Sequence, residues 1–228
     1  MAVATSPMTY AVLEELIGDM VLEPGSSAGL RYTQDKRQRA IIHAEVMALR
    51  HLSDDDCRNL IGRTGAATSA SGKIEVANLI ASGTDGDRFF DVIDIMNATR
   101  TGLAVHFKKV EQDKVKILDN LNYKYGYYWY YLGAGTLGTG NTREIQLKAA
   151  VDADYKAKGA IDIFVTFKIY PHSYSDYDVT AIVPFNRNEE LIAKGAAGFL
   201  LTNNDDPRGQ LLTQEFYAGL GLSAQEAA

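Results

Sequence analysis

The chain has 228 residues, of which 46% are hydrophobic and 23% charged, the composition of an ordinary globular protein. Its 23 basic and 29 acidic residues give a net charge of −6, and no basic stripe that would grip a nucleic-acid backbone is evident. The single cysteine, Cys57, excludes an internal disulfide and any multi-cysteine metal site. Residues 1–20 predict no signal peptide, and no apolar run is long enough to span a membrane. We therefore expect a cytoplasmic protein, and composition alone indicates no chemistry.

The N-terminal part of the chain predicts helices. Residues 8–22 carry an apolar stripe at helical spacing, with Thr9 as the N-cap and the stretch 23–27 as the end of the helix. Thr33 is placed to cap a second helix that runs to about Leu52. Ser53 followed by three aspartates predicts the start of a short third helix, because acidic side chains are favoured at a helix N-terminus.

The middle of the chain changes to the two-residue period of β-strands. Alternation predicts strands over residues 89–96, 103–108, 143–149 and 161–170. Residues 110–120 give a mixed signal that favours a helical turn weakly.

Helical periodicity returns after Pro184. Asn186 or Asn188 can cap a helix over residues 187–202, and a last helix is expected over residues 208–220, followed by a flexible tail. The fold class predicted from this order is α+β, a helical bundle from both chain ends that carries a central, mainly antiparallel β insert. The expected boundaries are 1–72 for the N-terminal helical part, 73–183 for the β insert and 184–228 for the C-terminal helices.

Residues Gly133 to Gly138 match the glycine pattern G-x-G-x-x-G of dinucleotide-binding loops. That site also needs a helix directly after the last glycine, so that its N-terminus holds the pyrophosphate. Here residues 139–142 lead into a strand, so the segment is better interpreted as a long hairpin tip. We expect no bound cofactor.

Seven aromatic residues lie between Tyr123 and Tyr131. One interpretation is a stacking platform for single-stranded nucleic acid or sugar. Such nucleic-acid platforms lie among basic residues, and only Lys124 lies inside this run. A strand packed on both faces, or one at a subunit contact, is the interpretation that we favour.

Histidine and acidic residues suggest no metal or catalytic site. His43 and His51 lie eight residues apart, too far for a metal-binding pair on one helix, and His106 and His172 are scattered. Neither the run Asp54–Asp56 nor the pair Asp85 and Asp87 has the spacing of a calcium loop. No nucleophile signature occurs, so we nominate no catalytic residue and expect the protein not to be an enzyme.

Four stretches follow one another in an order that carries a resemblance. They are residues 13–17 with 23–27 and 31–33, then 90–97, then the tyrosine-rich 125–131, and last 161–170 with Val183-Pro184-Phe185 and 189–201. Together these segments resemble the head-to-tail connector (adaptor) proteins of tailed phages, including the tail tubular protein A of short-tailed phages. The resemblance covers most of the chain, and chain order carries more of it than any single motif.

The resemblance implies a structural protein of the virion that forms a ring of about twelve copies between the portal and the tail. On it we base the assignment of portal docking to Phe216, Leu220 and Leu222, and of contact with tail or nozzle proteins to Gly135, Thr136, Leu137 and Thr139. Genomic DNA would pass the ring without specific binding, which an acidic protein favours by repulsion. The expected location is the head–tail junction, and the host cytoplasm before assembly.

Two other functions stay open. One is another neck or tail component, such as a terminator or a stopper. The other is a nucleic-acid or glycan-binding module that uses Trp129 and Tyr130 of the tyrosine-rich strand.

Overall fold

A computed structural model of the chain describes residues 7–22, 31–67, 72–75, 88–97, 106–111, 114, 127–134, 143–149, 162–171, 177–185 and 187–222. The chain divides into two compact units. The helical unit combines Met1–Leu60 with Tyr170–Ala228, and the β unit is Ile61–Ile169. The sequence-based boundaries had been placed at 72/73 and 183/184.

Four α-helices form the helical unit within the described residues: α1 (Tyr10–Met20), α2 (Gln34–His51), α5 (Glu189–Thr202) and α6 (Pro207–Gly219). Each begins where the sequence predicts. Thr33 Oγ1 accepts from Lys36 N at 3.5 Å, and Asp206 caps α6 directly before Pro207, whose fixed φ suits the first helical position. The short helix predicted after Ser53 is instead a capped turn that leads into the 3-10 helix η1 (Arg58–Leu60).

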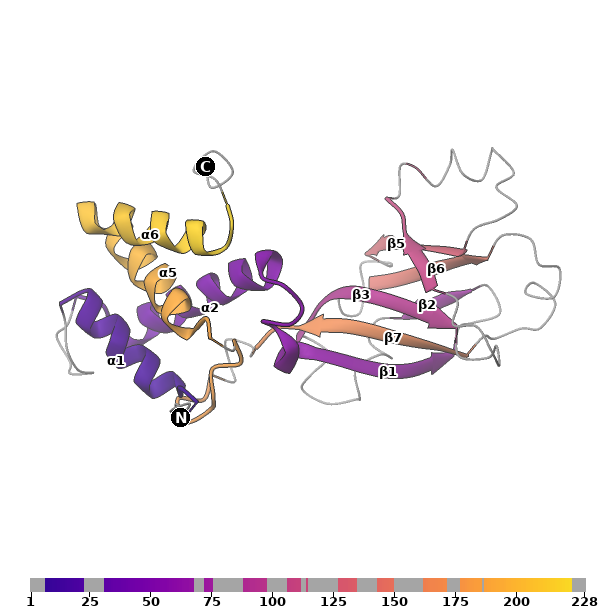
Figure 1. Cartoon of the computed structure of the whole chain (residues 1–228), viewed down its shortest axis with the longest axis horizontal. Helices are drawn as coiled ribbons and strands as arrows, with labels where there is room; N and C mark the ends of the chain where they lie inside the picture. Colours follow the sequence, from indigo (N-terminus) through magenta and orange to yellow (C-terminus); the bar gives the residue numbers. More distant parts are fainter. Residues whose placement is uncertain are drawn as a thin grey trace, which may run out of the picture. The chain divides into compact units, whose positions relative to one another are not determined.

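The prediction of a helical bundle is wrong. The described helices form two pairs that the strand insert separates in sequence, and α5 is the element against which α1, α2 and α6 each pack. Figure 1 shows α5 passing beside these three helices. The physical reason is the surface of α5, where small residues allow neighbours to approach on several sides: Ala193, Gly195, Ala196, Ala197 and Gly198 are all buried.

The β unit holds one curled sheet of seven strands: β1 (Ile61–Ala67), β2 (Lys73–Glu75), β3 (Phe89–Asn97), β4 (His106–Lys109), β5 (Tyr127–Ala134), β6 (Arg143–Ala149) and β7 (Asp162–Ile169). Their order across the sheet is β1-β7-β3-β4-β5-β6-β2. The pairing of β4 with β5 is parallel, and the other pairings are antiparallel.

The sheet is therefore mixed, and its one parallel pairing is not part of the predicted insert. Residues 110–126 between β4 and β5 are long enough for the crossover that a parallel pair requires, and the strand period alone does not reveal strand direction.

Alternation along the strands gives the β unit its core. In β7, Ile163, Val165 and Phe167 point to one face and are almost fully buried, while Asp162 and Phe164 are exposed. The core cluster consists of Ile74, Phe89, Val92, Ile95, Phe107, Trp129, Ile145, Leu147, Ile163, Val165 and Phe167. Burial of these apolar side chains stabilises the sheet, and no disulfide contributes because the chain has a single cysteine.

Candidate functional site

Helices α5 and α6 form a hairpin, and three glycines allow the two helices to approach each other closely. A Cβ atom on Gly195 would lie 2.8 Å from the ring of Phe216, and one on Gly198 would lie 2.6 Å from Thr213 Oγ1. A Cβ on Gly209 would lie 2.4 Å from the backbone nitrogen of Thr202. These approaches are closer than real Cβ contacts, so α6 lies directly on the backbone of α5 and is fixed there.

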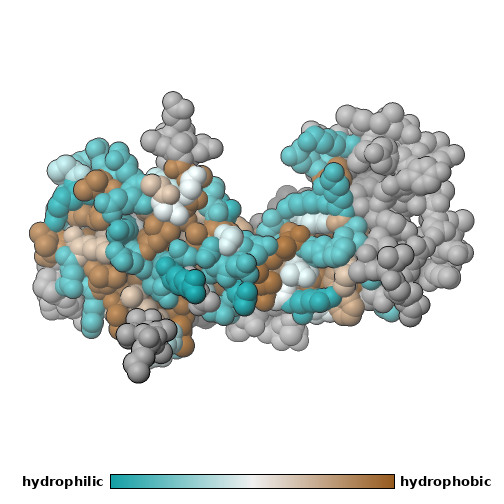
Figure 2. All heavy atoms as spheres, viewed as in Figure 1, coloured by the Kyte–Doolittle hydropathy of each residue, from teal (hydrophilic) through white to brown (hydrophobic). Residues whose placement is uncertain are grey.

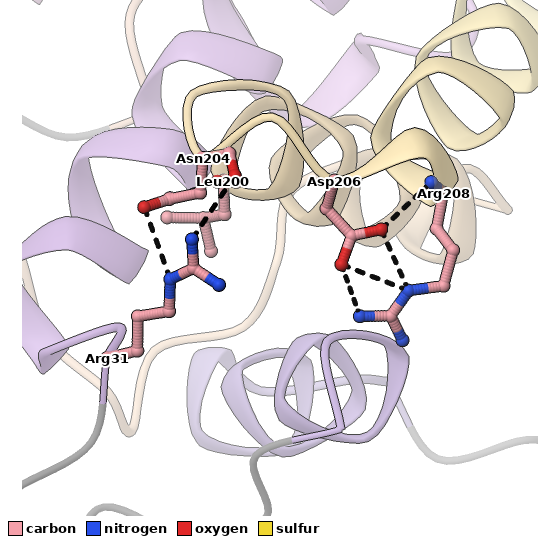
Figure 3. Close-up of polar contacts among 5 residues, drawn as sticks. All are labelled: Arg31, Leu200, Asn204, Asp206 and Arg208. Carbon is pink, nitrogen blue, oxygen red and sulfur yellow. Dashed lines mark hydrogen bonds and ion pairs between the residues drawn. The ribbon is translucent and has the colours of Figure 1, made fainter.

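The turn between the two helices is tight and polar. Asp205 adopts a left-handed φ of 58°, and the Asp206 carboxylate accepts from Arg208 N at 3.0 Å. The guanidinium of Arg208 also binds this carboxylate, at 2.7 Å from its Nη2 (Figure 3). These hydrogen bonds from Arg208, first from its side chain and then from its backbone, lower the pKa of Asp206 to about 2. The cap therefore stays ionised at every physiological pH.

Arg31, which lies just before α2, forms hydrogen bonds with the turn between α5 and α6. Its Nε donates to Asn204 Oδ1 at 3.3 Å and its Nη2 donates to Asn204 O at 3.2 Å (Figure 3). Asn204 Nδ2 in turn donates to Leu200 O at 2.7 Å. These hydrogen bonds join the end of α5 to Arg31, which lies 173 residues before Asn204 in the sequence.

The residues to which docking was assigned lie mostly inside this hairpin. Phe216 is fully buried, Leu220 is 7% exposed and Leu222 is half-buried. Phe216 packs on Phe199 of α5 with ring centroids 5.7 Å apart. Their side chains hold α6 in place, and their assignment to docking stays a prediction.

The side of α6 that faces solvent is formed by other residues. Leu211 is 59% exposed, and exposed positions follow it at helical spacing. We call this surface the outer face of α6; it consists of Leu211, Gln214, Glu215 and Ala218. Figure 2 shows apolar patches among hydrophilic surface where α6 lies. Leu211 is the one large apolar side chain of this face, and Glu215 on it pairs with Lys194 of α5 at 3.1 Å; a helix face of this kind can bind in a groove of a partner, and it is the candidate site of this chain.

The residues predicted to contact tail proteins, Gly135, Thr136, Leu137 and Thr139, lie outside the described residues. Of the glycine pattern, only Gly133 and Ala134 are described, at the end of β5. Asp85, Asp87 and His172 also lie outside the described part of the chain.

The tyrosine-rich strand is β5, and two of its aromatic rings are buried. Trp129 is 1% exposed and Tyr130 9% exposed. Lys109 Nζ lies 5.3 Å from the ring centroids of both Trp129 and Tyr131 and donates to the Asp91 carboxylate at 2.9 Å. Trp129 and Tyr130 therefore present no open ring face on which a base or a sugar could stack.

Histidines have ordinary surroundings. His43 packs edge-on against Phe199 at 4.5 Å, and its pKa is lowered first by burial and then by Arg50. His106 Nδ1 lies 2.9 Å from Asp94 Oδ2 on the neighbouring strand. In the part of the chain that the structure describes, no group of three or more His, Cys, Asp or Glu could hold a metal ion.

Sequence reasoning missed a polar cluster inside the helical unit. Tyr10 Oη donates a short hydrogen bond to Glu45 Oε1, and Glu45 is 1% exposed. Burial raises the pKa of Glu45 to about 8, although the hydrogen bond from Tyr10 acts in the other direction. The available signal was the position of Glu45 on the apolar face of α2, four residues after Ile41 and four before Leu49.

No described helix is long and apolar enough to cross a membrane. In the comparisons with known proteins, no family model matches this chain, and no curated protein matches it either.

Proposed function

We propose that this chain is a head-to-tail adaptor of a tailed phage, a structural protein that joins the portal to the tail. The observation that carries the proposal is the outer face of α6, an exposed surface on a helix that Gly195, Gly198 and Gly209 lock against α5. A docking surface that is already rigid before binding loses little entropy when the partner arrives. The order of segments along the chain, which resembles these adaptors, supplies the identity of the partner.

Two further features support the proposal. The chain forms two compact units, so that it can offer one surface to the portal and another to tail proteins or to copies of itself. Its net charge of −6 also suits a protein around a DNA channel, because like charges keep passing DNA from binding. Neither feature requires a catalytic group.

The location can be tested with immunogold labelling of purified virions, using an antibody against this chain. We expect gold confined to the head–tail junction, and peptides of the chain in a digest of the virions. Label along the tail or at its tip would replace the adaptor by a tail component such as a terminator. Absence of the chain from both label and digest would overturn a structural role in the virion.

The docking surface can be tested with the substitution Leu211→Glu and the portal protein of the same phage. Leu211 is the largest apolar side chain of the outer face, so a carboxylate in its place loses the burial that binding would provide and is left unpaired, and portal binding should weaken by about a hundredfold. The matched control is Val12→Glu, which places the same charge on α1 at a residue that is 47% exposed. Equal weakening by both variants would contradict the assignment to α6, and unchanged melting temperatures would show that both variants fold.

A further inference from the structure

Three segments of the helical unit meet around Glu45. The first turn of α1 donates to the segment 177–183, through Tyr10 N to Ala181 O at 3.0 Å and Ala11 N to Val179 O at 2.8 Å. Val183 N donates back to Met8 O at 2.9 Å. The segment 177–183 therefore supplies the acceptors that the N-terminus of α1 needs, and the two segments are joined along their backbones.

Side chains join both segments to α2. Tyr10 reaches Glu45 in the middle of α2, and the ring of Tyr177 packs against that of Tyr10 with centroids 5.1 Å apart. The Tyr177 side chain and the charge of Arg37 on α2 both act on the carboxyl of Glu14 in α1 and lower its pKa, against the larger effect of burial, which raises it. The cluster thus holds two carboxyl groups and two phenols, with one guanidinium nearby.

The interior position decides the protonation of Glu45. A carboxylate that loses water without an equivalent gain is costly, so the neutral form is favoured while the three segments are closed. If the three segments separate, so that α1 leaves both α2 and the segment 177–183, water reaches Glu45 and its carboxyl ionises as an ordinary glutamic acid does. Opening and proton release are then one coupled event.

We propose that α1 and the segment 177–183 form a proton-dependent latch on α2, closed while Glu45 is neutral and opened with release of its proton. The proposal is independent of the adaptor function, since it uses only contacts inside the helical unit. The groups that face Glu45 fit it. Burial raises the pKa of Tyr177 further above its usual value, so the phenol stays neutral over the range in which Glu45 titrates, and burial likewise raises the pKa of Glu14.

The sign of the pH dependence follows from the two states of Glu45. Its pKa is about 8 in the closed state against an ordinary value of 4.5 when it is hydrated. Between these two values the open state has already lost the proton and the closed state has not. The opening constant should therefore rise about tenfold for each pH unit across this window and level off above it.

Hydrogen exchange of the full-length protein measures this opening. The rates of the Tyr10, Ala11 and Val183 amides, divided by their intrinsic rates, should rise about tenfold per pH unit between pH 5 and 8. Glu45→Gln should remove this slope, because glutamine stays neutral at every pH. The control is Glu15→Gln, which alters an exposed glutamate of α1, and it should keep the slope of the unaltered protein.

Two results would overturn the latch. One is a slope that persists in Glu45→Gln, and the other is the absence of any slope in the unaltered protein. If Glu45→Gln does not fold, the ¹³C carboxyl shift of Glu45 in the unaltered protein decides. A titration midpoint near 8 supports the latch, and one near 4.5 excludes it.

Discussion

The two units of this chain are packed by opposite means. In the helical unit, α5 and α6 can pack closely because Gly195, Gly198 and Gly209 have no side chain. In the β unit, the core depends on large buried side chains, among them Trp129 and Phe167. The β unit has one counterpart of the first kind, Gly62, where a Cβ would lie 2.9 Å from the ring of Phe167. Adding a methyl group at the α5–α6 glycines should therefore destabilise the helical unit, and removing a buried aromatic ring should destabilise the β unit.

The units also differ in what they bury. Among the described residues, the buried charged side chains, Arg37 and Glu45, belong to the helical unit. The buried polar residues of the β unit are the amides Asn97 and Gln146, which do not titrate. The comparison can be followed with two probes at once, because the described helices α1, α2, α5 and α6 belong to one unit and the single tryptophan, Trp129, belongs to the other.

The largest expected effect is a pH dependence that only the helical unit shows. Because the pKa of Glu45 is raised, its neutral form stabilises the fold below the ordinary pKa of 4.5, and that stability is lost as pH rises toward about 8. In urea unfolding, helix stability should fall by on the order of 1 kcal/mol per pH unit over this window. Trp129 fluorescence should show no such trend, and Glu45→Gln should abolish it in the helices. If Trp129 fluorescence showed the same loss of stability with pH as the helices, the difference between the two units would be contradicted.

Next in size is removal of the largest buried ring of the β unit. Trp129→Ala leaves a cavity at a residue that is 1% exposed and should destabilise the unit by about 3–5 kcal/mol. Loss of protection of the β7 amides in hydrogen exchange measures this change. Phe164→Ala is the control, since Phe164 lies on the outer side of β7 and is 38% exposed. Similar losses in the two variants would mean that the core is not organised around Trp129.

A smaller effect is expected from a methyl group between α5 and α6. In Gly198→Ala the new Cβ would lie 2.9 Å from the backbone nitrogen of Thr213, so the helices must move apart. The overpacking costs about 1–3 kcal/mol, and alanine's better helix propensity offsets up to about 1 kcal/mol of it. The matched variant is Gly219→Ala, whose Cβ meets only the flexible end of Leu191. It should be neutral in thermal unfolding, and a loss equal to that of Gly198→Ala would contradict the backbone argument.

The smallest effect concerns a helix cap. Thr33→Ala removes the acceptor for Lys36 N at the start of α2 and should cost about 1 kcal/mol. Thr9 occupies the same position before α1 but makes no side-chain cap hydrogen bond. Thr9→Ala should therefore change the unfolding free energy much less, and chemical denaturation of the two variants measures the difference.

Local signals in the sequence predict the elements well and their assembly poorly. Thr33, the apolar face of α2 and the alternation from Ile163 to Phe167 are short-range patterns, and the elements that they predict are present. The parallel pair of β4 and β5 joins strands whose periodicity carries no direction, so it could not be predicted. The bundle was predicted from apolar stripes, but the small residues of α5 determine which helices meet. At the candidate site, the sequence places Phe216 in the last helix, and the structure shows that its ring is buried against Phe199 of α5.

The helical unit is discontinuous along the chain, and this sets the order in which the protein can form during translation. The β unit, contiguous from Ile61 to Ile169, is synthesised in full before α5 and α6. Meanwhile α1 and α2 have emerged without the helix against which they pack, so Leu13, Ile17, Ile41 and Leu49, all buried in the finished protein, still lack part of their cover. A nascent chain stalled near Tyr170 is thus the form of this protein most exposed to aggregation, and the one in which a chaperone has the most to bind.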